Sequence, residues 1–258
     1  MNLQRSLALL AVLALVAGCS PGTPLPPPPT DDPTADSAFV LLSSMQRTRL
    51  DTAFARLAAY DFTRLDRVVE RDARGLRIAF DETIVASDAP ASPLRHDHAG
   101  TFSRGPFGGW LGGSTTAPPP DPVPYLLDTE PAFLTPRYRD AFTYRLLPDT
   151  LLWGRLARVV EVAARPGTEQ RLRAARLYLE AETNELIGLR VRREDPALLF
   201  RERSRYVLTL RPAGGPDWLP HLFRYHTALV PLFGAPRHFE RLVVHYALRP
   251  KASGPAMP

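Results

Sequence analysis

The feature that most limits what this chain can fold into is a series of alternating segments in its second half. From residue 138 nearly to the C-terminus, apolar and polar residues alternate, which gives each segment one apolar face, as in half-buried β-strands. Short turns such as 165–168 and 234–236 separate the segments and favour antiparallel neighbours. The predicted strands are 138–146, 156–163, 171–181, 186–193, 198–211, 218–229 and 239–248.

Two earlier segments extend this pattern toward the N-terminus. Residues 62–71 and 76–86 are strand-like, and the short Gly-containing connection at 72–75 is typical of a β-hairpin. Residues 171–181 contain good helix formers, but the turns on both sides and the equal segment lengths favour a strand. The pattern therefore predicts about eight to ten antiparallel strands.

The clearest helix lies before these strands, at residues 37–59. Its apolar residues recur at short steps on one face, and Asp36 or Ser37 can cap its N-terminus. A large sheet curls because its strands twist, and an amphipathic helix must lie against another apolar surface. The sequence predicts an α+β fold: a strongly curved antiparallel sheet, or unclosed β-barrel, with the N-terminal helix packed in its concave face. The apolar helix face comprises Leu41, Met45, Leu50, Ala53, Phe54 and Leu57.

The N-terminus predicts export and lipidation. Residues 1–18 carry one positive charge and an apolar run shorter than the roughly 20 residues of a membrane helix, which is typical of a secretory signal peptide. The run ends at Cys19, the only cysteine of the chain, in a segment that resembles the bacterial lipobox. The resemblance implies cleavage before Cys19 and its acylation, and Ser20 implies an outer-membrane address. The alternative is a secreted protein with a buried free thiol.

The remaining boundaries follow from composition. Residues 19–36 are rich in proline, which predicts an extended tether. We assign residues 37–250 to the folded domain and residues 251–258 to a disordered tail. Residues 88–135 interrupt the strand pattern and are too long for an ordinary connection. We interpret them as a flexible insert, which is either disordered or a mobile flap over an apolar opening.

The charge of the chain does not indicate nucleic-acid binding. The net charge is +5, and apart from Lys251 every basic residue counted in it is an arginine, scattered among 27 acidic residues. Nucleic-acid binders concentrate their positive charge in one patch or along one helix. Weak attraction to anionic lipid headgroups is one use of this charge, and simple solvation of the strand faces is the other.

The order of helix and strands resembles the lipoprotein localisation family, LolA and LolB, and the N-terminal domain of the regulators RseB and MucB. The matching segments are 57–62, 152–162 and 175–187, the last being a strand, acidic turn and strand, and the resemblance extends over residues 37–210. It implies an unclosed barrel whose apolar cavity holds acyl chains without catalysis. The insert at 88–135 departs from the family.

Motifs for catalysis, cofactors or metals are weak in this sequence. His96-Asp97-His98 offers two histidines in a Pro-flanked loop without further ligands, whereas a structural zinc site needs four. No nucleophile elbow and no phosphate-binding loop occur. We expect no enzyme activity, no metal and no cofactor.

These observations favour an outer-membrane lipoprotein that faces the periplasm. It would bind lipid, or the acyl chains of another lipoprotein, in an apolar cavity, as an acceptor in trafficking. The alternatives are an envelope-stress sensor or interaction module with an envelope protein partner, and a structural envelope lipoprotein with a filled core. Alternation does not tell which face of the sheet is concave, so the candidate lining residues are one choice of face. They are Phe80, Tyr144, Val160, Val162, Leu189 and Val191.

Overall fold

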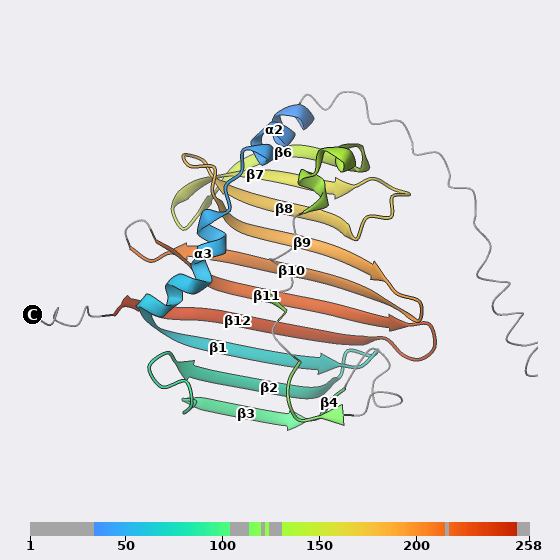
Figure 1. Cartoon of the computed structure of the whole chain (residues 1–258). Helices are drawn as coiled ribbons and strands as arrows, with labels where there is room; N and C mark the ends of the chain where they lie inside the picture. The colour runs from blue at the N-terminus through green and yellow to red at the C-terminus, as the bar shows by residue number, and fades with distance from the viewer. Residues whose placement is uncertain (1–33, 104–113, 120–121, 124–130, 215–216, 252–258) are drawn as a thin grey trace, which may run out of the picture.

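The fold is one antiparallel sheet of ten strands with helices across one face (Figure 1). The computed structural model describes residues 34–103, 114–119, 122–123, 131–214 and 217–251. Cys19 and the predicted signal peptide lie outside the described residues, as do nearly all of the tether and of the tail. The strands of the sheet are β1 (Tyr60–Arg71), β2 (Arg77–Ala86), β3 (Arg95–Gly100), β6 (Phe142–Leu152), β7 (Arg155–Ala164), β8 (Leu172–Glu180), β9 (Leu186–Pro196), β10 (Phe200–Pro212), β11 (Trp218–Pro231) and β12 (Arg237–Pro250).

The strand order is β3-β2-β1-β12-β11-β10-β9-β8-β7-β6. From β6 to β12 each strand pairs with the next one in the chain, as short turns dictate. The last strand, β12, then pairs with β1, and β1 pairs on its other side with β2 to form the N-terminal hairpin. The two edges, β3 and β6, do not pair with each other, so the sheet is an unclosed, curved barrel.

The prediction of one helix over residues 37–59 is wrong, because two helices occupy this segment. α2 (Ala35–Ser43) and α3 (Thr48–Arg56) are separated by a short extended stretch, and the 3-10 turn η1 (Leu57–Ala59) leads into β1. In the break, Gln46 forms a parallel bridge with the β8–β9 turn: its N–H donates to the Asn184 carbonyl (3.1 Å), and its carbonyl accepts from the Leu186 N–H (2.9 Å). These bonds replace the helical ones that the chain gives up at this point.

Both helices lie on the concave face of the sheet, as the sequence predicts (Figure 1). α2 packs against β6, and α3 packs against β9 and β11. Ala38, Leu42, Leu50 and Ala53 are buried in the same core cluster as the inward residues of β6–β12. The helices therefore cover one side of the concave face and leave the β12–β3 side to other segments.

The segment interpreted as an insert contributes a strand to the main sheet. β3 pairs with β2 along the edge, and β4 (Phe102–Ser103) pairs with β5 (Ser114–Thr115) in a separate small sheet. β3 lacks an alternating pattern because it is polar and almost fully exposed at the edge, so periodicity could not reveal it. Two 3-10 turns, η3 (Ala132–Leu134) and η4 (Pro136–Ala141), then lead into β6.

Candidate functional site

The concave face has an apolar floor that crosses most of the sheet. Residues directly opposite on paired strands share a face, so the register defines continuous rows. One row begins at Leu146 on β6 and continues to Val243 on β12, and every member is apolar. The row comprises Leu146, Val160, Leu177, Leu189, Leu208, Phe223 and Val243. A parallel row holds Tyr144, Val162, Ala175, Val191, Tyr206 and Tyr225.

The apolar floor ends at an ion pair. The second row reaches Arg241 on β12, and the first reaches Asp66 on β1. Arg241 donates to both carboxylate oxygens of Asp66, through Nε at 3.0 Å and Nη2 at 2.6 Å. Its Nη1 also donates to the Pro119 carbonyl at 3.0 Å. The Arg241–Asp66 pair thus interrupts both apolar rows, and Arg241 ties the 114–119 segment to the concave face.

A cavity of about 570 Å³ lies between the helix break and the apolar floor. Met45 and Leu50 form the helical wall, and Pro131 and Phe133 form a second wall. The β7–β8 turn also lines the cavity, and because its Glu169 and Arg171 are exposed, we call this side the mouth. The floor consists of Ala175, Leu177, Leu186, Leu189, Val191 and Tyr206. We call this the concave cavity, and its size is within the usual range of about 300–1,000 Å³ for small-molecule sites.

The interior of the concave cavity is uncharged, whereas its rim is not. Burial raises the pKa of Tyr206 to about 12, against the smaller opposing effect of Arg193 and Arg47, so its phenol stays neutral at physiological pH. The charged side chains that line the cavity are Arg47, Glu169, Arg171 and Arg193. Arg193 and Arg171 each contact Asp195, at 3.4 Å and 3.2 Å. This arrangement fits an amphiphile, with the tail inside and the polar head at the rim.

The helical wall is held in place by the acidic turn between β8 and β9. The Glu180 side chain is 3% exposed and contacts Arg49 of α3 through a short charge-assisted hydrogen bond, and Arg155 at 3.3 Å. The Glu185 carboxylate accepts from the Arg49 N–H at 3.2 Å. Asn184 donates to the Leu41 carbonyl at 3.1 Å and to Ser44 Oγ at 2.7 Å. The turn therefore positions the Met45–Leu50 wall over the sheet.

Five of the six predicted lining residues lie on the concave face, in two groups, and the sixth, Phe80, lies elsewhere. Leu189 and Val191 line the concave cavity. Tyr144, Val160 and Val162 share its face but are buried in the core that includes Ala38 and Leu42 of α2. The Tyr144 hydroxyl donates to the Phe133 carbonyl at 2.8 Å, and burial raises the pKa of Tyr144 to about 12. The structure thus brings five of the six residues onto one face.

Phe80 lies on the opposite, convex face. Its cross-strand partner is Val69, whereas the neighbouring concave positions hold Val68 and Ala79, which pack against Phe102. Arg77 covers the Phe80 ring at 5.0 Å from its centroid. The alternation of 76–86 correctly separates two faces but does not tell which one is concave.

Sequence reasoning missed the lining residues outside the strands. Met45 and Leu50 belong to the predicted apolar helix face, so a signal for them existed. Pro131 and Phe133 fall in the segment interpreted as an insert, and nothing local indicates that Phe133 returns to the core, where it is 3% exposed. Their place depends on how the chain crosses the concave face, which is a tertiary property.

A second concave pocket, of about 360 Å³, lies over β10–β12 and β1, next to Arg241. Phe200, Tyr225 and Phe239 line it, and Pro119 and Pro122 cover it. Val123, next in the chain, is 7% exposed and belongs to the main core cluster. The described part of the 114–123 segment therefore covers the concave face where the helices do not.

Two adjacent turns at one end of the sheet are apolar throughout. The β9–β10 turn exposes Leu198 and Leu199, by 84% and 46%, and the β11–β12 turn exposes Leu232 and Phe233, by 64% and 78%. A hydrogen bond from the Leu232 N–H to the Leu199 carbonyl (2.8 Å) joins the turns. In an antiparallel sheet these turns share an end with the β7–β8 turn at the mouth of the concave cavity. Turns usually carry polar residues, so this end is unusual.

His96 and His98 both lie beside Asp81, at 3.0 Å and 3.4 Å, on the β2–β3 edge. Within the described ranges, no group of three or more His, Cys, Asp or Glu side chains could hold a metal ion. No helix in this part of the chain is long and apolar enough to span a bilayer.

Comparisons with known proteins give distant structural neighbours only. No protein-family model and no curated protein matches the sequence. An outer membrane lipoprotein-sorting protein domain from Vibrio parahaemolyticus aligns with 85% of this chain and 94% of its own, at 10% identity and a TM-score of 0.29. A DUF1329 family protein from Desulfovibrio piger has the same coverage and identity, with a TM-score of 0.27. A LolA superfamily protein from Nitrosomonas europaea aligns with 87% of this chain and 94% of its own, at 8% identity and a TM-score of 0.24.

Two of these descriptions name the lipoprotein-sorting or LolA proteins that the sequence resembles. All three TM-scores lie below 0.5. The fold therefore rests on the strand order and register described above, and these alignments decide nothing about function.

Proposed function

We propose that this protein binds the acyl chain of a lipid or of another lipoprotein in the concave cavity. The observation that carries the proposal is the cavity itself: about 570 Å³ between the broken helix and the sheet, with an apolar floor and a charged rim. A structural protein with a filled core would not need this space, because protein interiors are normally close-packed.

The expected affinity follows from burial of methylene groups. Each CH₂ transferred from water contributes about 0.8 kcal/mol, so ten to twelve of them contribute roughly 8–10 kcal/mol. Association costs at least about 4 kcal/mol, so about 4–6 kcal/mol remains, which corresponds to a Kd between about 40 μM and 1 mM. Such binding would allow a chain to be accepted and passed on.

The apolar end of the sheet supports a location at a lipid surface. The β9–β10 and β11–β12 turns would contact the membrane, and the mouth of the cavity lies at the same end. With acylated Cys19 as an anchor, the protein would be a stationary acceptor on the outer membrane, facing the periplasm. Its partners would then be lipid, or an acylated lipoprotein.

The test is displacement of a fluorescent fatty acid from protein that starts after Cys19. Ala132 is half-buried at the cavity wall, so Ala132→Trp should fill the cavity and weaken probe binding at least tenfold. The matched control is Ala163→Trp, because Ala163 is also half-buried but alternates onto the convex face. Equal binding by Ala132→Trp, Ala163→Trp and the wild type would overturn the proposal, as would no binding by a folded wild type.

A further inference from the structure

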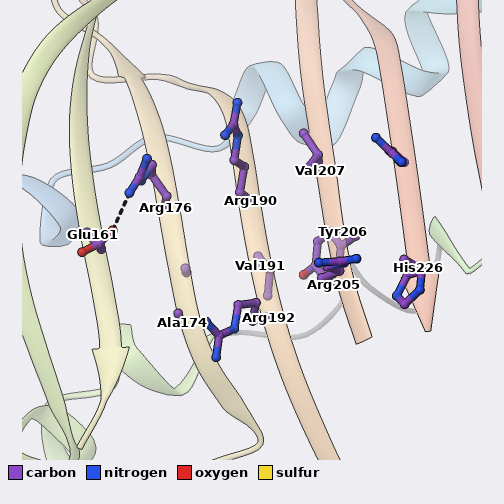
Figure 2. A pocket seen from close by; sticks show the side chains of 12 residues that line it. Glu161, Ala174, Arg176, Arg190, Val191, Arg192, Arg205, Tyr206, Val207 and His226 are labelled. Carbon is purple, nitrogen blue, oxygen red and sulfur yellow. Dashed lines mark hydrogen bonds and ion pairs between the residues drawn. The ribbon is translucent and has the colours of Figure 1, made fainter. Parts of the chain in front are cut away.

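The convex face of the sheet carries a groove lined by arginines (Figure 2). Its volume is about 570 Å³, and it lies across β7–β11, on the side of the sheet away from the helices. Its charged and ionisable lining residues, which define the arginine groove, are Glu161, Arg176, Arg190, Arg192, Arg205, Arg224 and His226. Five cations thus face one carboxylate.

The register places like charges directly opposite one another twice. Arg176 of β8 faces Arg190 of β9, and Arg192 of β9 faces Arg205 of β10. Directly opposite residues have Cβ atoms about 5 Å apart, and like charges at this separation destabilise a sheet. Two such pairs side by side have a cost in folding that a bound anion would remove.

Only one of the five arginines has its charge balanced. Arg176 donates to Glu161 at 2.7 Å, and Glu161 also accepts from Arg145 at 2.7 Å. In the part of the chain that the structure describes, Arg190, Arg192, Arg205 and Arg224 have no carboxylate within ion-pair distance. All four are exposed.

Arginines closer to the ends of the same strands are paired. Arg201 and Arg203 both contact Glu194, at 3.3 Å and 3.4 Å, and Arg173 contacts it at 3.4 Å. The strands can therefore supply counter-charges where they are needed for structure. In the middle of the face, Glu161 pairs with Arg176, and the other four arginines of the groove have no such partner among the described residues.

His226 of β11 lies directly opposite Arg205 of β10 in the groove. Burial, followed by the charge of Arg205, lowers the pKa of its imidazole, while Glu240 opposes the shift. The histidine therefore adds no positive charge at neutral pH and leaves the guanidinium groups as the cationic donors.

We propose that the arginine groove binds clustered phosphate groups, either on the headgroups of anionic lipids or on a soluble polyphosphate. The planar guanidinium fork matches phosphate oxygens, and one phosphate can accept from the arginines of two neighbouring strands. None of the strands β8–β11 is an edge strand, and four arginines of the groove are exposed on them, so the groove is accessible to either source. The site is separated from the concave cavity by the sheet and does not depend on acyl-chain binding.

The first experiment is calorimetric titration with tripolyphosphate at 150 mM NaCl, using protein that starts after Cys19. Removing one arginine from a phosphate contact should weaken binding about fivefold, so Arg192→Gln/Arg205→Gln should weaken it more than tenfold. The control, Arg201→Gln/Arg203→Gln, removes the same net charge from the same face and should change affinity less than twofold.

The second experiment separates the two sources of phosphate. Vesicles of phosphatidylcholine with 30% phosphatidylglycerol are sedimented with the wild type and both double variants. We call Arg192→Gln/Arg205→Gln the groove variant. If only this variant loses sedimentation, and neither the wild type nor a variant binds tripolyphosphate, the site is assigned to headgroups. If the groove variant loses tripolyphosphate binding but sediments with vesicles as the wild type does, the site is assigned to a soluble polyphosphate. Loss of both tripolyphosphate binding and sedimentation in the groove variant also supports the proposal.

Thermal unfolding keeps the test independent of folding defects. Because the groove variant relieves a like-charge pair, its Tm without phosphate should be about 1–3 °C above that of the wild type. Tripolyphosphate should raise the Tm of the wild type but not that of the groove variant. Equal losses of binding in both double variants would overturn the proposal in favour of net charge, and so would preferential binding of a polyglutamate peptide.

Discussion

Replacing Arg49 with methionine should destabilise the protein by leaving the Glu180 carboxylate buried without its main partner. Arg49 is the contact between α3 and the acidic turn, and its guanidinium also lies 5.4 Å from the Trp218 ring centroid. Methionine keeps most of the aliphatic length and removes the charge. The helical wall of the concave cavity depends on this contact.

The magnitude follows from the surroundings of Glu180. Removing one partner of a buried ion pair costs about 3–5 kcal/mol. Here Arg155 remains at 3.3 Å, and the Thr183 hydroxyl still donates at 2.6 Å, so the lower end applies. We expect a loss of about 3 kcal/mol, equivalent to a fall in Tm of about 6–12 °C for a domain of this size.

The pH dependence of stability provides a second signature. Burial acts to raise the pKa of the Glu180 carboxyl, but hydrogen bonds from Thr183 and Arg49 and the charges of Arg49 and Arg155 outweigh it and hold the pKa below its ordinary range. The carboxylate therefore stabilises the fold above its unfolded-state pKa of about 4.3, and this contribution is lost as the pH falls through the folded-state pKa. The stability advantage of the wild type over Glu180→Gln should thus shrink below about pH 4.

The assay is urea denaturation of Arg49→Met, Glu180→Gln and the double variant. The double variant should lose at least 1 kcal/mol less than the sum of the single losses, since the two side chains interact. Arg56→Met is the matched control on the same helix, because Arg56 pairs with Asp217 at 3.3 Å while both side chains are over a third exposed. Its loss should stay below about 1 kcal/mol. An Arg49→Met loss no larger than this, or an additive cycle, would refute the reasoning.

Three further outcomes are expected. Asn184→Ala should cost about 1–2 kcal/mol in urea denaturation, because Asn184 has a φ of 58° and loses both of its bonds to the helix break; a loss below 0.5 kcal/mol would contradict this. Gly100→Ala should lower the Tm, because a Cβ would stand 2.1 Å from the Ile78 carbonyl oxygen at a φ of 75°; an unchanged Tm would show that β3 is not packed on β2 as described. Leu199→Ser/Phe233→Ser should reduce sedimentation with lipid vesicles while changing stability by less than about 1 kcal/mol, and undiminished sedimentation would exclude a membrane contact at these turns.

The strands were predictable because local alternation determines them. Each predicted segment from 156–163 onward corresponds to one strand of the sheet, including residues 171–181, where β8 spans Leu172–Glu180. Burial of one face against the helices imposes this period, so it is visible without tertiary information. The edge strand β3 was not predicted, because neither of its faces is buried and its sequence therefore does not alternate.

The break in the helix depends on residues about 140 positions away. Asn184 satisfies the Leu41 carbonyl and Ser44, and the backbone of the β8–β9 turn pairs with Gln46. The sequence does carry a trace of this break, because the apolar spacing lengthens to five residues between Met45 and Leu50. Nothing local indicates what the freed backbone groups contact.

The candidate site was predictable in part for a related reason. Alternation places Leu189 and Val191 on one face and Arg190 and Arg192 on the other, but only the position of the helices decides which face is concave. Phe80 was therefore assigned to the wrong side, whereas Leu189 and Val191 line the cavity. The arginine groove arises from the register between strands, which single-strand patterns do not contain.

The most direct test of acyl-chain binding is photo-crosslinking with a fatty acid that carries a diazirine near its tail. Protein that starts after Cys19 is irradiated with this probe, and the labelled peptides are mapped by mass spectrometry. Binding in the concave cavity predicts label on Met45, Phe133 and Leu189, and its loss in Ala132→Trp but not in Ala163→Trp. Label confined to Phe80 and the arginine face, or no label above that of unfolded protein, would contradict the account.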